Sequence, residues 1–167
     1  GAAGATGAQG PAGATGATGA TGPQGPAGAT GATGATATNE NAMLYNTDAT
    51  AITSGSDVTL GTNVINSTGS ITVSGTTGVT LTAGQYLVTF VSDASVTAAG
   101  TVGAALALDG TALTYAETAQ TLTAAGSDHI ALTAIVTPTA GQILTVRNNT
   151  GNSVTYSNST LTIVKLA

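Results

Sequence analysis

Hydrophobic and hydroxyl-bearing residues alternate in short runs through the last three quarters of the chain. Clear examples are the segments 70–73, 79–82 and 161–164, in which valine, isoleucine or leucine alternates with serine or threonine. Glycine, asparagine, aspartate and serine separate such runs about every 8 to 12 residues. A period of two predicts strands with one buried face, and this spacing predicts an antiparallel sandwich or barrel.

Few segments compete with this all-β interpretation. Residues 98–108 are rich in alanine, but Gly100 and Gly103 lower their helix propensity. The pair Asp109-Gly110 follows this segment and predicts a tight hairpin turn. The sequence Thr-Ala-Gly-Gln occurs at 82–85 and again at 139–142, each time before an apolar run. We interpret these two segments as equivalent corners of a fold with two sheets.

The first 36 residues follow a different pattern, with glycine at every third position from Gly1 to Gly34. Only glycine fits where three polyproline-II chains crowd one axis, so this period predicts a collagen triple helix. We therefore expect a stalk at 1–36, a linker at 37–41 and a head at 42–167. Proline occupies only the second triplet position in the stalk, which excludes hydroxyproline at the third and favours a bacterial or viral collagen.

Threonine fills the third position in seven triplets of the stalk. Side chains at that position point out of a triple helix, so the hydroxyls form an exposed row. They are candidates for O-glycosylation, by analogy with other threonine-rich stalks, or they simply solvate an uncharged rod. The residues are Thr6, Thr15, Thr18, Thr21, Thr30, Thr33 and Thr36.

The charge and the missing cysteines exclude several classes of partner. Seven acidic and two basic residues give a net charge of −5, and none of them lies in the stalk. A nucleic-acid partner is not expected, because no basic patch could neutralise phosphates. The sequence has no cysteine and no apolar run of about 18 residues, so neither disulfides nor membrane insertion is expected. The sequence begins at Gly1, and we expect an anchoring segment to precede it.

The sequence does not suggest an enzyme, and no cofactor is expected. His129 is the only histidine. Its neighbours Ser127 and Asp128 cannot form a relay with it, because adjacent strand residues point to opposite faces. We expect an exposed or hydrogen-bonded His129, although three copies could meet on an axis and bind a metal or an anion. Calcium held by Asp93 or Asp109 of three chains is a second open alternative.

The head resembles a known group of trimeric domains. The supporting segments are Gly-Gln-Tyr-Leu-Val-Thr-Phe at 84–90, Leu-Ala-Leu-Asp-Gly-Thr at 106–111, Ala-Gly-Gln-Ile-Leu at 140–144 and Ser-Thr-Leu-Thr-Ile-Val-Lys-Leu at 159–166. After a collagen stalk, they look like the complement-type, tumour-necrosis-factor-like heads. They are more closely similar to the collagen-like glycoproteins of the spore exosporium, which form the hair-like nap on bacterial spores.

This resemblance implies a homotrimer of ten-stranded jelly rolls. From the strand period alone, Tyr86, Val88 and Phe90 share one face of a strand, and Leu161 and Ile163 share one face of another. These five residues are expected in the core or at the trimer interface.

The expected function is that of a non-enzymatic structural protein on an outward-facing bacterial surface, with the spore exosporium as its location. An anchor protein would hold it through the preceding segment. The alternative is a receptor- or glycan-binding adhesin, or a phage-type tail fibre, whose partner would be a glycan or a host surface.

Overall fold

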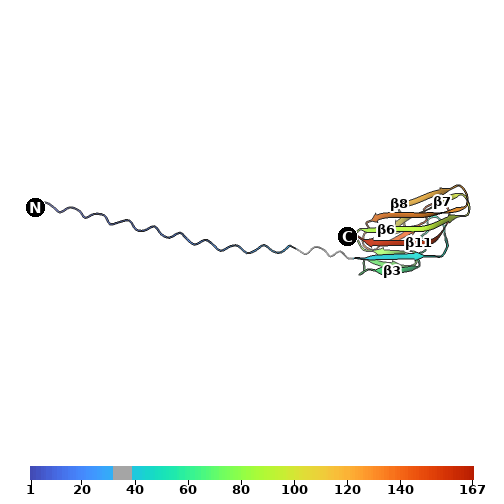
Figure 1. Ribbon diagram of the computed structural model, residues 1–167, viewed down its shortest axis with the longest axis horizontal. Coiled ribbons are helices and arrows are strands. Elements are labelled where there is room, and N and C mark those ends of the chain that lie inside the picture. The colour runs from blue at the N-terminus through green and yellow to red at the C-terminus, as the bar shows by residue number, and fades with distance from the viewer. Residues whose placement is uncertain (32–38) are drawn as a thin grey trace. The chain divides into compact units, whose positions relative to one another are not determined.

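The computed structural model describes residues 1–31 and 39–167. The chain divides into two compact units, Gly1–Gly34 and Ala35–Ala167, both drawn in Figure 1. In the first unit, residues 1–31 form neither helix nor strand and are exposed. A Cβ atom added to any repeat glycine from Gly1 to Gly31 would have no heavy atom within 4 Å.

The second unit is built from strands, which confirms the all-β expectation for the part of the chain that the structure describes. These described residues include no helix long and apolar enough to cross a membrane. The strands are β1 (Asn41–Asn46), β2 (Thr50–Ile52), β3 (Thr62–Asn66), β4 (Ile71–Ser74), β5 (Gly78–Leu81), β6 (Tyr86–Val96), β7 (Gly100–Leu108), β8 (Thr111–Leu122), β9 (Gly126–Val136), β10 (Gln142–Arg147) and β11 (Val154–Lys165).

The strands form two antiparallel sheets. The six-stranded sheet has the order β3-β1-β11-β6-β9, with β2 also paired to β11, and the five-stranded sheet has the order β4-β5-β10-β7-β8. Successive strands repeatedly lie in opposite sheets, as β5 and β6 do, and then β6 and β7. This winding is that of a jelly roll.

The described residues of the second unit form eleven strands, where the resemblance implied ten. The additional strand is β2, whose residues 50–52 pair with residues 154–156 of β11. Strand β1 pairs with residues 159–164 of the same strand. Because β11 is 12 residues long, its one edge accommodates β1 and β2 in succession.

The predicted hairpin at Asp109-Gly110 is confirmed. Leu108 pairs with Thr111, and the two turn residues have φ angles of 48° and 76°. Positive φ at both central positions is the geometry of a type I′ turn, which favours this pair of residues. The alanine-rich segment that precedes the turn is strand β7. Its Gly103 allows close packing, because a Cβ there would lie 2.2 Å from the carbonyl oxygen of Thr118.

The two Thr-Ala-Gly-Gln segments are corners that lead into different sheets. Gly84, with a φ of 151°, precedes β6 of the six-stranded sheet, and Gly141, with a φ of 88°, precedes β10 of the five-stranded sheet. The left-handed φ of Gly141 favours glycine at that corner.

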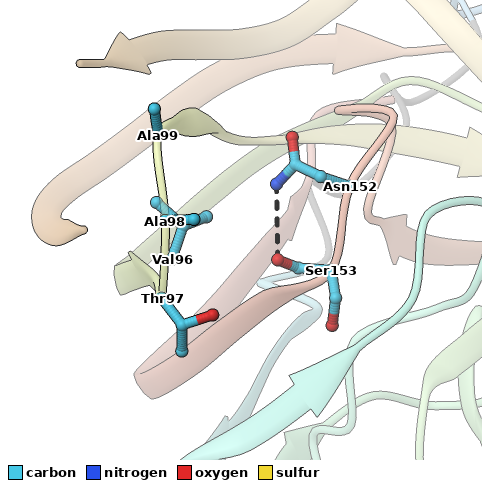
Figure 2. Close-up of a pocket in the computed structure, with 6 residues that line it drawn as sticks. All are labelled: Val96, Thr97, Ala98, Ala99, Asn152 and Ser153. Carbon is cyan, nitrogen blue, oxygen red and sulfur yellow. Dashed lines mark hydrogen bonds between the residues drawn. The ribbon is translucent and has the colours of Figure 1, made fainter. Parts of the chain in front are cut away.

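Asparagine side chains organise the loops at one end of the sandwich. The Asn152 amide donates to the carbonyl oxygen of Thr101 at 2.9 Å and accepts from the backbone N–H of Thr101 at 3.1 Å. It also donates to the carbonyl oxygen of Ser153, a bond drawn in Figure 2. Asn148 is fully buried and donates to the carbonyl oxygens of Ile52 and Asn152 at 2.8 and 2.9 Å. These bonds replace the backbone pairing that the loop residues lack.

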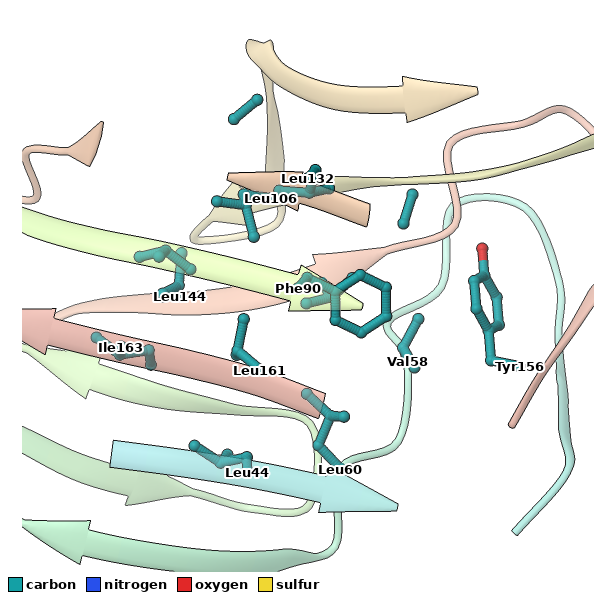
Figure 3. Packing of buried hydrophobic residues seen from close by; sticks show 14 of the residues in the cluster. Leu44, Val58, Leu60, Phe90, Leu106, Leu132, Leu144, Tyr156, Leu161 and Ile163 are labelled. Carbon is teal, nitrogen blue, oxygen red and sulfur yellow. The ribbon is translucent and has the colours of Figure 1, made fainter. Parts of the chain in front are cut away.

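The hydrophobic core lies between the two sheets. Figure 3 shows Phe90 and Leu161 of the six-stranded sheet in the same cluster as Leu106 and Leu144 of the five-stranded sheet. All four side chains are fully buried. Strand β6 alternates buried and more exposed residues over its whole length, as a strand with one face on the core must.

Strand β11 keeps its apolar residues in the core by means of a β-bulge. Its register with β6 shifts between Ser157 and Thr160, and Asn158 has a φ of 50°. Tyr156 is buried before the bulge and Leu161 after it. The one additional residue at the bulge shifts the alternation of the strand, so that both Tyr156 and Leu161 point into the core.

Candidate assembly surface

Four large apolar side chains lie exposed on the outward face of the six-stranded sheet. They are Met43 on β1, Val64 on β3, Leu87 on β6 and Ile135 on β9, with exposed fractions of 39%, 59%, 37% and 53%. Leu44, Val88 and Val136, which adjoin three of these residues, are buried, and Val64 lies opposite Met43, so all four point away from the core. We call this surface the outer apolar face.

The strand register brings these residues together in two groups. Met43 lies directly opposite Val64 on the neighbouring strand. Leu87 lies opposite Ile135 on one side and Val164 on the other. Residues directly opposite in an antiparallel pair have Cβ atoms about 5 Å apart. Each group is therefore a continuous apolar patch.

Threonines fill the space between the two patches. Thr162 lies opposite both Met43 and Thr89, and Thr89 lies opposite Thr133. The hydroxyls of Thr89 and Thr133 are 3.1 Å apart and form a hydrogen bond. Among the described outward positions of this sheet, Asp93 is the only carboxylate, His129 is the only histidine, and there is no lysine or arginine. The face is thus largely uncharged, and it can be covered by another surface with little loss of ionic hydration.

A polar cluster lies at one end of this face. Asp93 on β6 accepts a hydrogen bond from the amide of Asn158 at 2.8 Å, and its other carboxylate oxygen lies 3.0 Å from Nδ1 of His129. The hydrogen bonds from Asn158 and His129 hold the pKa of Asp93 below its usual value. The β11 bulge places Asn158 in this cluster, so the contact depends on a backbone feature that sequence reasoning missed.

His129 was expected to be exposed or hydrogen-bonded, and the structure shows its contacts in this cluster. The imidazole of His129, near the start of β9, is hydrogen-bonded to Asp93, while the backbone N–H of His129 donates to the Asp128 carboxylate at 2.9 Å. Asp93 and His129 are paired residues of one register position on adjacent strands. The described residues of the single chain contain no group of three potential metal ligands.

Asp109, the second calcium candidate, has a different role in the described structure. Its carboxylate accepts hydrogen bonds from the backbone N–H of Ile143 at 2.9 Å and from the amide of Gln142 at 3.2 Å. These bonds attach the type I′ turn to β10.

A second polar cluster, which sequence analysis did not identify, surrounds Glu40. This carboxylate is only 4% exposed, and it accepts hydrogen bonds from the backbone and side chain of Thr68 and from Ser67. The ammonium group of Lys165 donates to the hydroxyl of Ser70 at 2.8 Å. Hydrogen bonds from Ser70 and Thr68 lower the pKa of Glu40 to about 2. The sequence contains the isolated acid at position 40 and the hydroxyl-rich Ser-Thr-Gly-Ser segment at 67–70, but it does not show that they lie together.

The five residues predicted for the core or the trimer interface all lie inside the single chain. Each is fully buried: Tyr86, Val88, Phe90, Leu161 and Ile163. The exposed apolar residues lie at the alternate, outward positions of the strands. In β6, for example, Leu87 is exposed between the buried Tyr86 and Val88. The same strand period could have identified them, since every second residue of a half-buried strand points outward.

Five of the seven candidate glycosylation sites lie in the described part of the stalk. Thr6, Thr15, Thr18, Thr21 and Thr30 are exposed. Thr33 and Thr36 lie outside the described residues, as do the first two residues of the expected linker at 37–41.

Comparison with known proteins identifies the fold of the second unit. No protein-family model and no curated protein matches the sequence. Among solved structures, the globular domain of zebrafish complement 1qA is similar, with a TM-score of 0.58 and 12% identity over 77% of this chain and 98% of that one. Murine APRIL at pH 5.0 is also similar, with a TM-score of 0.57 and 18% identity over 77% and 99% of the two chains. The head therefore has the jelly-roll fold of these proteins.

Proposed function

We propose that the protein is a homotrimeric structural protein of a bacterial surface. Three chains would wind into a collagen-like stalk that carries three jelly-roll heads. The observation that carries this proposal is the unbroken glycine period from Gly1 to Gly34.

The surroundings of the glycines support association of the stalk. Within one chain, the described repeat glycines have open space in place of a side chain. No contact within the chain therefore requires glycine at these positions. Three chains around a common axis do require it, because any Cβ would collide there.

The outer apolar face supports association of the heads. Four of the seven exposed large hydrophobic side chains among the described residues lie on this face. In a threefold assembly each contact joins two different patches of neighbouring subunits. The outer apolar face would supply one patch. Tyr115, which is 63% exposed on the edge strand β8, is a suitable residue for the other.

The proposed structural role requires neither catalysis nor a cofactor. His129, the only histidine, is hydrogen-bonded to Asp93 at the end of the outer apolar face. We propose that the protein is not an enzyme and that it holds no cofactor.

The proposed location is the outside of the cell, with the hair-like nap of the spore exosporium as the most specific form of the proposal. A segment preceding Gly1 would bind an anchor protein, and the exposed threonines of the stalk would carry O-glycans. A receptor- or glycan-binding adhesin or a phage-type fibre is the alternative. The observation that favours a binding role is a small open pocket in the head.

Immuno-electron microscopy of intact spores from the source bacterium tests the structural proposal. Antibodies against the head should label the tips of surface filaments, and a strain lacking the gene should have neither label nor filaments. Label on phage particles, or filaments that are unchanged in the deletion strain, would contradict it.

A further inference from the structure

The pocket opens at the end of the sandwich between the β6–β7 loop and the β10–β11 loop (Figure 2). Its volume is about 190 Å³. The lining residues are Val96, Thr97, Ala98, Ala99, Asn152 and Ser153.

The walls of the pocket are held in place by internal hydrogen bonds. Asn152 is tied to both polar backbone atoms of Thr101 at the start of β7. Asn148 holds the base of the same loop from the protein interior. A preformed pocket binds without the entropic cost of ordering its loops.

The lining combines hydroxyl groups with methyl groups and contains no charge. Figure 2 shows the hydroxyls of Thr97 and Ser153 on opposite sides of the opening. Neither hydroxyl has a hydrogen-bond partner among the described residues, and both residues are exposed. Ala98 and Ala99 supply an apolar surface next to them. A suitable ligand therefore has hydroxyls on its edge and a C–H surface beside them.

The size and charge of the site narrow the ligand further. Pockets for drug-sized ligands have volumes of roughly 300–1,000 Å³. This pocket is smaller and suits one sugar ring rather than an oligosaccharide. The chain has a net charge of −5, which disfavours acidic sugars.

We propose that this pocket binds the terminal residue of a neutral glycan. The proposal rests on the glycan-binding alternative given above and not on the structural role. Two sources could present such a sugar, namely a host surface and an O-glycan on the stalk of a second copy.

Saturation-transfer NMR of the full chain provides the test. The probes are the methyl glycosides of galactose, rhamnose and N-acetylglucosamine at millimolar concentration, with methyl sialoside as the acidic control. We expect transfer to at least one neutral glycoside and none to the sialoside. Absence of transfer to every neutral probe, or equal transfer to the sialoside, would overturn the proposal.

Substitutions then locate the site. Ala98→Trp fills the pocket and should abolish transfer, whereas Thr72→Trp on the exposed part of β4 should not change it. Ser153→Ala removes one hydroxyl and should weaken binding by about fivefold. This milder variant covers the case in which Ala98→Trp fails to fold. Unchanged binding in a folded Ala98→Trp protein or in Ser153→Ala would also overturn the proposal.

A competition experiment separates the two sources. Glycosylated full chain, isolated from the source organism, should displace the bound glycoside if the ligand belongs to a second copy, and unglycosylated chain should not. If glycans released from host cells displace the glycoside and the glycosylated chain does not, the ligand belongs to the host surface. Neither result depends on whether the protein forms the filaments of the nap.

Discussion

Phe90 is a fully buried residue near the centre of strand β6. It is the only phenylalanine of the chain, and it packs in the cluster between the two sheets. Replacing such a residue by alanine costs about 3 to 5 kcal/mol. Phe90→Ala should therefore lower the melting temperature of the head strongly and weaken trimer formation, as measured by calorimetry and sedimentation.

His129→Ala is the matched control for Phe90→Ala. Its side chain is 65% exposed in the single chain, and its hydrogen bond to Asp93 lies at the end of the outer apolar face, six residues along β6 from Leu87. Exposed pairs of this kind contribute little to the stability of a fold. The variant should stay trimeric with little change in melting temperature. A His129→Ala protein that dissociates, or a Phe90→Ala protein as stable as the parent, would show that core and interface are misplaced.

Because of Glu40, the stability of the head depends on pH in the acidic range. Its pKa is about 2 in the folded protein and 4.5 in the reference state, so the charged form is stabilised by folding. The resulting stabilisation is fully present above pH 4.5 and is lost as the pH falls through about 2. Glu40→Gln should therefore melt below the parent at neutral pH, and the difference should shrink steadily with acidification. A difference that is constant over this range would contradict the buried-carboxylate interpretation.

The features of the strands that depend only on residues close together in the sequence could be predicted. The hairpin at Asp109-Gly110 and the inward residues of β6 followed from turn chemistry and a period of two. The β11 bulge at Asn158 and the short strand β2 did not, because both arise from the pairing of residues far apart in sequence. The Asp93–His129–Asn158 cluster depends on that bulge. For this reason the sequence identified two members of the cluster separately and could not join them.

The outer apolar face is the element on which assembly of the heads depends. Leu87 lies between Ile135 and Val164, so a charge at this position would enter the centre of an apolar patch. Leu87→Lys should abolish trimer formation without unfolding the head, because the side chain makes no part of the core. Circular dichroism reports the fold and sedimentation the assembly.

Thr72→Lys, at an exposed position on β4, which lies at the opposite edge of the five-stranded sheet from β8 and Tyr115, is the control for charge. It should leave the trimer intact. Full trimer formation by Leu87→Lys would place the interface elsewhere on the head.

The stalk is the element in which glycine matters most. Gly19→Ala introduces a methyl group where the three chains would meet. The collagen band in circular dichroism should therefore melt at a lower temperature, while the transition of the head stays in place. Ala20→Ser, at the neighbouring second triplet position, should change neither transition. If Gly19→Ala lowered both transitions equally, stalk and head would form a single cooperative unit.

At the scale of the whole molecule, the stalk and the head contribute differently to assembly. The stalk has no charged residues to set the register of three chains and no proline at the third triplet position to stiffen them. The head, by contrast, has a buried core and a largely uncharged apolar face. We therefore expect the heads to associate first and to align the chains, after which the triple helix forms from the head towards Gly1.

The central claim is that three chains form one molecule, and its most direct test is sedimentation equilibrium of the full chain at micromolar concentration. The account predicts a mass three times the 15.7 kDa of the single chain, with no concentration-dependent loss of the trimer in this range. A particle with the mass of one chain, or of two, would contradict it.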